Sequence, residues 1–232
     1  STIVDWNAAK FIYRSKKNSS SSRIFLFLSL FANLTLLGIF KYLDLIIRTL
    51  NFAALTVDSS YSFELFNLAL PVGISFYTFQ TMSYTIDIYR RKSKPMSSFA
   101  DFACYAAFFP QLVAGPIVRS DYFRKQIKNP LSLQNNNIKI GLTFIIYGLL
   151  KKLVIADNVA IQVDYIFNSG LNYTNFWLIW VGAFLFAIQI YADFSAYTDI
   201  AIGSAKFFGI DLPENFKHPY FATSPQDFWR KW

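Results

Sequence analysis

Polar side chains interrupt the end of a long apolar run in the last fifth of the sequence, where Asp193, Ser195, Tyr197, Thr198 and Asp199 fall within two helical turns. A charge at the centre of a bilayer-length helix costs roughly 2.5–3.5 kcal/mol on insertion scales, so a carboxylate is generally retained there for a purpose. The helical repeat places Asp193 and Tyr197 on one face, and Ser195 and Asp199 on another. A substrate contact and a structural role both remain open for Asp193.

The second feature that could contribute to a functional site is a proline-broken stretch, FFPQLVAGPIVR. It ends an uncharged run over residues 102–118 that contains Gln111, Gly115 and Pro116. Irregular backbone at membrane depth persists only inside protein or beside a cavity. Basic clusters flank the run on both sides, so a simple crossing would put one of them on the wrong side of the membrane. We predict a re-entrant or in-plane segment over residues 99–118 that lines a pocket; the alternative is a kinked crossing helix.

Several other kinds of site lack the residues they need. The chain has one cysteine and one histidine, whereas a zinc site uses several such ligands at short spacing, so we expect no metal. A serine–histidine–aspartate triad would have to use His218, for which interfacial packing against Tyr220 is the favoured interpretation. Cys104 stands among aromatic residues and is interpreted as buried packing.

The composition predicts that a membrane protein holds these residues in place. Hydrophobic residues make up 54% of the 232 and charged residues 16%, against about 25% charged in soluble domains. The net charge of +8 comes from basic residues that cluster beside apolar runs. That pattern is typical of cytoplasmic loops and anionic lipid contact rather than of nucleic-acid binding. The chain opens without an initiator methionine, and we expect it to be the central portion of a longer protein.

The apolar runs predict an all-α fold, a polytopic membrane helical bundle that forms a single membrane domain over residues 1–232. Basic loops then lie inside and acidic loops outside, with the re-entrant segment preserving the alternation. Spanning helices are predicted at about residues 24–44, 65–89, 138–156 and 175–200, and an interfacial segment at 212–232.

One face of the second predicted helix carries Gln80, Tyr84 and Asp87, at spacings of four and three residues. The favoured interpretation is a polar stripe that faces the bundle and holds helices together, with a substrate contact as the alternative. Arg91 follows Asp87 by four residues, which is the spacing of a helical ion pair.

Four motifs in this order resemble the membrane-bound O-acyltransferase family: PVGISFYTFQTMSYTIDIYR (residues 71–90), FFPQLVAGPIVR (108–119), YADFSAYTDIAIG (191–203) and LPENFKHPYFATSPQDFWRKW (212–232). The resemblance is strongest to the bacterial branch that includes alginate O-acetyltransferase and the teichoic-acid D-alanyl transfer protein. The motifs cover most of the chain after residue 41, so the match is specific.

The resemblance implies an integral protein of the bacterial cytoplasmic membrane. Its donor would be a cytoplasmic thioester, acyl-CoA or an acyl-carrier thioester, with no bound cofactor. The acyl group, most simply acetyl, would pass to a hydroxyl of an extracytoplasmic polysaccharide or envelope polymer, with an extracytoplasmic partner protein and the lipid bilayer as partners. A transporter or channel, suggested by Asp193 and the broken helix, and a non-catalytic scaffold remain the alternatives.

The resemblance also implies site residues. The family places one histidine directly after the FWRKW-like motif and a second in a later helix, so no catalytic residue is expected within this chain, which alone should be inactive. The tunnel and substrate-binding residues implied are Gln111, Gly115, Pro116, Arg119, Asp193, Ser195, Tyr197, Asp199, Asn215, Pro219, Tyr220, Trp229 and Arg230. For Arg119 the implied partner is a phosphate of the donor or of lipid.

Overall fold

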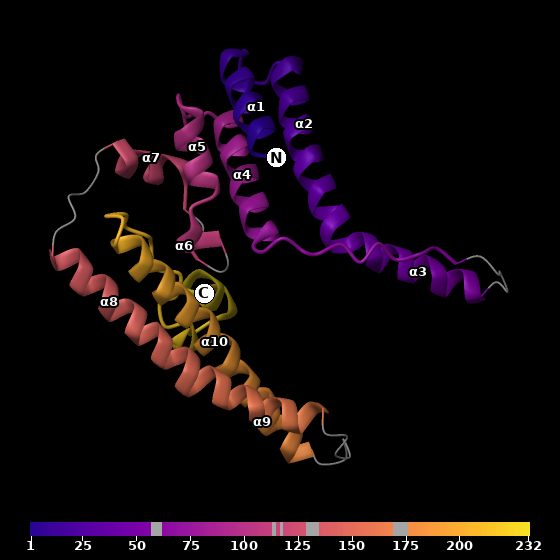
Figure 1. The fold of residues 1–232 in the computed structure, drawn as a ribbon, viewed down its shortest axis with the longest axis vertical. Helices are drawn as coiled ribbons and strands as arrows, with labels where there is room; N and C mark the ends of the chain where they lie inside the picture. Colours follow the sequence, from indigo (N-terminus) through magenta and orange to yellow (C-terminus); the bar gives the residue numbers. More distant parts are fainter. Residues whose placement is uncertain (57–61, 113–114, 117, 129–134, 169–175) are drawn as a thin grey trace. The chain divides into compact units, whose positions relative to one another are not determined.

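A computed structural model describes residues 1–56, 62–112, 115–116, 118–128, 135–168 and 176–232, and over these ranges the chain is helical and contains no strand (Figure 1). The predicted all-α class is thereby confirmed. The chain forms two compact units. The first comprises Ser1–Val113 with Arg119–Lys125, and the second comprises Ala114–Val118 with Gln126–Trp232. The single domain over residues 1–232 stays a prediction.

Three helices pack together in the first unit: α1 (Thr2–Arg14), α2 (Ser20–Leu37) and α4 (Ile74–Tyr89). A polar cluster lies between them. Asp5 is fully buried, and its Oδ1 accepts hydrogen bonds from the hydroxyl of Ser29 and the amide of Asn33, each at 2.6 Å. Thr81 on α4 donates to Asn33 at 3.3 Å. A buried polar group must find such partners, so this cluster fixes the register of the three helices.

Helix α2 continues without a break through η1 (Gly38–Tyr42) into α3 (Leu43–Thr56). This continuous helix and α10 (Phe176–Lys206) of the second unit are each long and apolar enough to cross a bilayer, with mean hydropathies of 2.0 and 1.6. The predicted span 24–44 and residues 176–200 of the predicted span 175–200 lie within these two helices, and their crossing of a membrane stays a prediction. The spans predicted at 65–89 and 138–156 fall outside these two helices and stay predictions.

Helix α4 begins at Ile74, nine residues later than the sequence predicts. Ahead of it the backbone is held by side chains of α3: Asp44 accepts from the backbone N–H groups of Phe66 and Asn67 at 3.0 and 3.1 Å. Gly73, at φ 73°, then turns the chain into the helix. Pro71 therefore precedes the helix instead of occupying its first turn.

The polar stripe on α4 faces the bundle, as predicted. Gln80 and Tyr84 are buried; Gln80 donates to the carbonyl of Tyr105 at 2.9 Å, and the Tyr84 hydroxyl accepts from the N–H of Met96 at 3.0 Å. The predicted pairing of Asp87 with Arg91 is wrong. The helix ends at Tyr89, and Arg91 adopts a left-handed conformation that turns its side chain to other partners.

The proline-broken segment contains two short helices, α5 (Phe99–Ala106) and α6 (Phe109–Leu112). At 1.5 Å per residue, α5 is only about 12 Å long, too short for a hydrocarbon core of about 30 Å. The flanks of the segment meet in the first unit, where the Ser93 and Ser120 hydroxyls lie 3.3 Å apart. The chain thus leaves and returns at one place, which favours the re-entrant or in-plane interpretation. Cys104 is exposed on α5, so its predicted burial is wrong: the opposite face, with Phe102 and Tyr105, is the buried one.

The second unit is built on a helical hairpin. Helix α8 (Asn135–Leu150), the π-helix η2 (Lys151–Ala156) and α9 (Asp157–Asn168) run continuously and pack along α10. Glycines allow close approach: a Cβ on Gly203 of α10 would lie 2.5 Å from the carbonyl oxygen of Gly141 on α8. One full heptad further, a Cβ on Gly148 would lie 2.7 Å from the carbonyl oxygen of Ala196. Small residues at such contacts are the usual device for packing helices in a bilayer.

Candidate functional site

The carboxylates of α10 are paired with two adjacent lysines. Lys151 Nζ lies 2.6 Å from Asp199 Oδ2, and Lys152 Nζ lies 2.8 Å from Asp193 Oδ1. Lys152 has a second acidic partner, Asp157, at 2.7 Å. The Lys151–Asp199 pair is the more buried of the two, with 25% and 15% of the side chains exposed. Each acid in the apolar helix therefore has a cation opposite it, as the cost of an unpaired charge in a low-dielectric setting requires.

The two lysines, adjacent in sequence, pair with acids on different faces of α10. Residues 151–156 form a π-helix between the α-helical turns of α8 and α9. Such local widening inserts an extra residue and re-aims side chains, and it is common at functional sites. The predicted separation of the α10 residues on two faces is visible in their partners: Asp199 faces Lys151, while Tyr197 places its ring 5.7 Å from the Lys152 ammonium, beside Asp193.

A cavity of about 440 Å³ opens on the Lys151–Asp199 side of α10. Its lining combines apolar and aromatic side chains with hydroxyls, an amide and charged groups. Ser195 and Thr198 are almost fully buried, 4% and 3% exposed. The lining residues are Phe144, Tyr147, Lys151, Tyr191, Ser195, Thr198, Asp199, Ile202, Glu214, Asn215, Phe216 and His218.

A sharp turn after α10 folds the C-terminal segment back over this cavity. Gly209, at φ 67°, stands in a Schellman motif in which Ile210 N–H donates to the carbonyl of Ala205 and Gly209 N–H to that of Lys206, each at 3.0 Å. Lys206 forms an ion pair with Asp211 just beyond the turn. Glycine is suited to this position because it adopts positive φ without a Cβ clash.

The returning segment is held against α10 by polar and aromatic contacts. The Asn215 amide donates to the Thr198 hydroxyl at 3.2 Å, and the Tyr220 hydroxyl donates to the carbonyl of Ala187 at 2.6 Å. The ring of Phe216 lies edge-on to that of Tyr191, with centroids 5.6 Å apart. Buried aromatic edge contacts of this kind add about 0.5–1.5 kcal/mol each beyond their burial, so the segment forms a fixed wall of the cavity.

Three of the implied site residues, Ser195, Asp199 and Asn215, line the cavity together. Asp193 and Tyr197 lie beside Lys152 instead. Gly115 and Pro116 are buried in the second unit.

Gln111 and Arg119 belong to the first unit. Gln111 is 2% exposed and donates to the carbonyl of Tyr105 at 3.0 Å, a contact that braces the broken segment. Arg119 is exposed. Substrate roles for these residues stay predictions.

The FWRKW motif forms α11 (Pro225–Lys231), whose first N–H groups are capped by the Ser224 hydroxyl. Lys231 and Arg230 approach Asp227 at 2.7 and 2.6 Å and hold the pKa of its carboxyl down at about 2, so it is charged at neutral pH. The ring of Trp229 is 72% exposed, and the Arg230 side chain is 80% exposed. Neither lines the cavity, whereas Pro219 is buried at the start of η3 (Pro219–Phe221).

Sequence reasoning missed Lys151, Glu214 and the place of His218. His218 lines the rim of the cavity, and its ring contact among the described residues is with Phe221, at 6.5 Å, rather than with Tyr220. A signal for Lys151 was available in the sequence. Two acids in an apolar helix are expected to have cationic partners, and residues 151–152 are two adjacent lysines in the neighbouring apolar run.

Comparisons with known proteins assign the fold to a family. The model of MBOAT, the membrane-bound O-acyltransferase family, matches residues 90–232. A peptidoglycan O-acetyltransferase of Helicobacter pylori is 37% identical over 100% of this chain and 48% of its own length. A probable alginate O-acetylase AlgI of Pseudomonas syringae is 38% identical over 89% and 39%, and a teichoic acid D-alanyltransferase of Bacillus subtilis is 26% identical over 72% and 42%. The chain spans less than half the length of each of these relatives.

Proposed function

The chain belongs to the membrane-bound O-acyltransferase family, and from that premise we propose that the intact protein moves an acyl group, most simply acetyl, to a hydroxyl of an extracytoplasmic polysaccharide. The relatives named for acetyl transfer to peptidoglycan and alginate support this acyl group and this acceptor class. A cytoplasmic thioester supplies the acyl group, in a bacterial cytoplasmic membrane and with a partner protein on the outer side.

The observation that carries the proposal is the cavity of about 440 Å³ in the second unit. It lies within the residues that match the family and is formed by the motifs of residues 191–203 and 212–232 together. Its mixed lining suits a reaction between an apolar acyl chain or thioester and a polar alcohol, because ligand sites combine apolar walls with a few placed polar groups.

The chemistry is attack of a hydroxyl oxygen on the thioester carbonyl, with loss of the hydroxyl proton to a base and departure of the thiolate. We assign the base to a histidine of the intact protein outside these 232 residues. The residues of this chain bind and orient. The partly buried Lys151–Asp199 pair fixes charge at the cavity wall, and the Thr198 hydroxyl and Asn215 amide present a hydrogen-bonding edge to the acceptor. Such fixed dipoles act strongly where water is excluded.

Filling the cavity tests the proposal. We expect Ser195→Leu in the intact protein to reduce base-labile acetyl on the envelope polysaccharide at least tenfold, because the new side chain occupies the space beside Asp199. Ala183→Leu adds the same side chain to an exposed position of α10 and should leave acetylation unchanged. Thr198→Val, which keeps the volume and removes only the hydroxyl, should reduce the rate while the protein stays folded. Normal acetylation by Ser195→Leu at equal abundance would refute the role of this cavity.

A further inference from the structure

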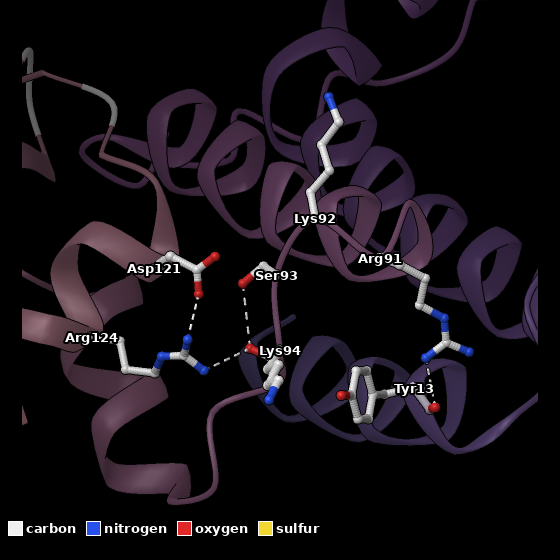
Figure 2. A pocket seen from close by; sticks show the side chains of 7 residues that line it. All are labelled: Tyr13, Arg91, Lys92, Ser93, Lys94, Asp121 and Arg124. Atoms are coloured by element: carbon white, nitrogen blue, oxygen red, sulfur yellow. Dashed lines mark hydrogen bonds and ion pairs between the residues drawn. The ribbon is translucent and has the colours of Figure 1, made fainter.

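A basic pocket of about 620 Å³ lies in the first unit, where the end of α4 meets the end of α1 and the start of α7 (Ser120–Lys128) (Figure 2). Four of its lining side chains are cationic and one is acidic, so its field is positive. The seven lining residues are Tyr13, Arg91, Lys92, Ser93, Lys94, Asp121 and Arg124. None of them belongs to the cavity of the second unit.

The Arg91 guanidinium is bound by other groups of the protein, so Arg91 supports the pocket structurally and is not available to a ligand. It stands at φ 60° in a Schellman motif that ends α4, a conformation that costs a non-glycine residue about 1 kcal/mol or more. Its guanidinium donates to the carbonyls of Tyr13 at 2.7 Å, Ile12 at 3.2 Å and Ser15, and lies 5.0 Å from the Tyr13 ring. It therefore neutralises the negative end of α1, which would otherwise repel an anion.

The cations left for a ligand are Lys92, Lys94 and part of Arg124. Arg124 binds Asp121 at 2.7 Å and the carbonyl of Lys94 at 3.3 Å, and the latter contact ties α7 to the turn after α4. Within the described residues neither lysine forms an ion pair, and both are exposed. Figure 2 shows their side chains extending in different directions, with that of Lys92 turned away from Arg124. Two mobile ammonium groups beside a fixed guanidinium suit an anion with several oxygens.

Exposed aromatic side chains lie on α1, α5 and α7, and one of them, Tyr13, lines the pocket. Tyr13 on α1 is 38% exposed, Phe99 on α5 40% and Tyr122 on α7 45%. Basic residues next to exposed aromatic rings are typical of a surface that lies at the headgroup level of a bilayer. The basic loops also predict this end of the first unit to be cytoplasmic, the side on which anionic lipid attracts such clusters. A soluble anion would use the cations without needing exposed aromatic rings on the same helices.

We propose that the Arg91–Arg124 pocket is a binding site for the phosphate of an anionic phospholipid headgroup in the cytoplasmic leaflet. The Lys94 ammonium and the free N–H groups of Arg124 hold the phosphate oxygens, the flexible side chain of Lys92 turns toward the headgroup when lipid binds, and the acyl chains leave past Tyr13. The bound lipid would join α1, α4 and α7 and so stabilise the flanks of the broken segment. The site is independent of acyl transfer in the second unit.

The test compares the intact protein in nanodiscs of phosphatidylcholine alone with nanodiscs that also contain phosphatidylglycerol. Retained lipid is measured by native mass spectrometry, and unfolding by heat. We expect phosphatidylglycerol to bind wild type and to raise its Tm. The double variant Lys92→Gln/Lys94→Gln should bind it with an affinity lower by about fivefold for each lysine removed. The matched control is Lys16→Gln/Lys17→Gln, which removes the same charge from exposed positions outside the pocket.

The proposal is supported if only the pocket variant loses the lipid while its Tm in phosphatidylcholine equals that of wild type. An equal loss in both variants would overturn it, because the attraction would then be that of the whole basic surface. A third arm adds inorganic phosphate or glycerol 3-phosphate to phosphatidylcholine nanodiscs. A rise in Tm as large as that given by phosphatidylglycerol, abolished by the same variant, would show a soluble-anion site and also overturn the lipid assignment.

Discussion

At the scale of single residues, the two acids of α10 differ in how much each depends on its lysine. Asp199 and Lys151 have each other alone as ion-pair partners in the described part of the chain, whereas Lys152 is shared between Asp193 and Asp157. Removing one member of an ion pair that is shielded from water leaves the other charge unpaired. That unpaired charge usually accounts for the larger part of the stability lost. Asp193 is also the more exposed acid, at 39% against 15%.

Neutralising the acids should therefore have unequal effects. We expect Asp199→Asn to lower the free energy of unfolding by about 1–2 kcal/mol, since the pair is only partly buried. Asp193→Asn should cost roughly half as much or less, because Lys152 retains Asp157. Both are read as Tm in detergent on the intact protein. If Lys151→Met restores the stability lost in Asp199→Asn, the unpaired lysine is the cause; a further loss in the double variant would contradict it.

The sequence analysis identified Ser195, Asp199 and Asn215, which line one cavity, but it did not identify all the other residues of that cavity. Ser195 and Asp199 were conspicuous as polar residues in an apolar run, whereas Asn215 was implied by the resemblance to the family. His218 and Glu214 reach the cavity only because the chain reverses at Gly209 and returns along α10. Asn215 and Thr198 are 17 residues apart when they bond. Such contacts depend on a turn, and periodicity within one helix does not report them.

At the scale of elements, hydropathy found the helices and misplaced their ends. Residues 65–73 are as apolar as the helix that follows, yet they form no helix. Asp44 accepts hydrogen bonds from two of their backbone N–H groups, those of Phe66 and Asn67. That contact spans more than twenty residues of sequence, so no local pattern contains it. The π-helix at 151–156 is equally hidden, because the acids that pair with its two lysines lie on another helix.

The glycine contact between α8 and α10 gives a prediction at this scale. We expect Gly203→Ala to destabilise the protein, because its new methyl group would lie 2.5 Å from the carbonyl oxygen of Gly141 and 2.8 Å from Ile145. Separating the helices loses packing on the scale of an overpacked core, about 1–3 kcal/mol. The matched control is Gly38→Ala in the helix of the first unit, where nothing lies within 4 Å of the added atom.

In Gly38→Ala the better helix propensity of alanine should leave Tm unchanged or raise it. The readout for both variants is thermal unfolding of the intact protein in detergent. A fall of Tm in Gly38→Ala equal to that in Gly203→Ala would show that the effect comes from glycine itself rather than from the close approach of two helices.

At the scale of the whole molecule, the family and the all-helical class were predictable because the motifs and the composition extend along most of the chain. The division into two compact units was not predicted, although a polar stretch of sequence, QIKNPLSLQNNN (residues 126–137), begins at the boundary between them. The re-entrant or in-plane path stays a prediction from charge. Basic clusters on both flanks of residues 99–118 are expected to share a side of the membrane, and in the first unit these flanks are hydrogen-bonded to each other.

That shared side can be measured by labelling single cysteines in intact cells and in inverted vesicles, in a Cys104→Ser background. Lys92→Cys precedes the broken segment and Lys125→Cys follows it; both positions are exposed. Because Arg124 donates to the carbonyl of Lys94 at 3.3 Å, both cysteines should react with a membrane-impermeant maleimide from the cytoplasmic side. Ser62→Cys lies in the acidic connector of residues 51–64, which the charge pattern predicts to be outside, and it should react from the opposite side. Labelling of positions 92 and 125 from opposite sides would mean that the segment crosses the bilayer, and the contact between its flanks could not then exist in the membrane.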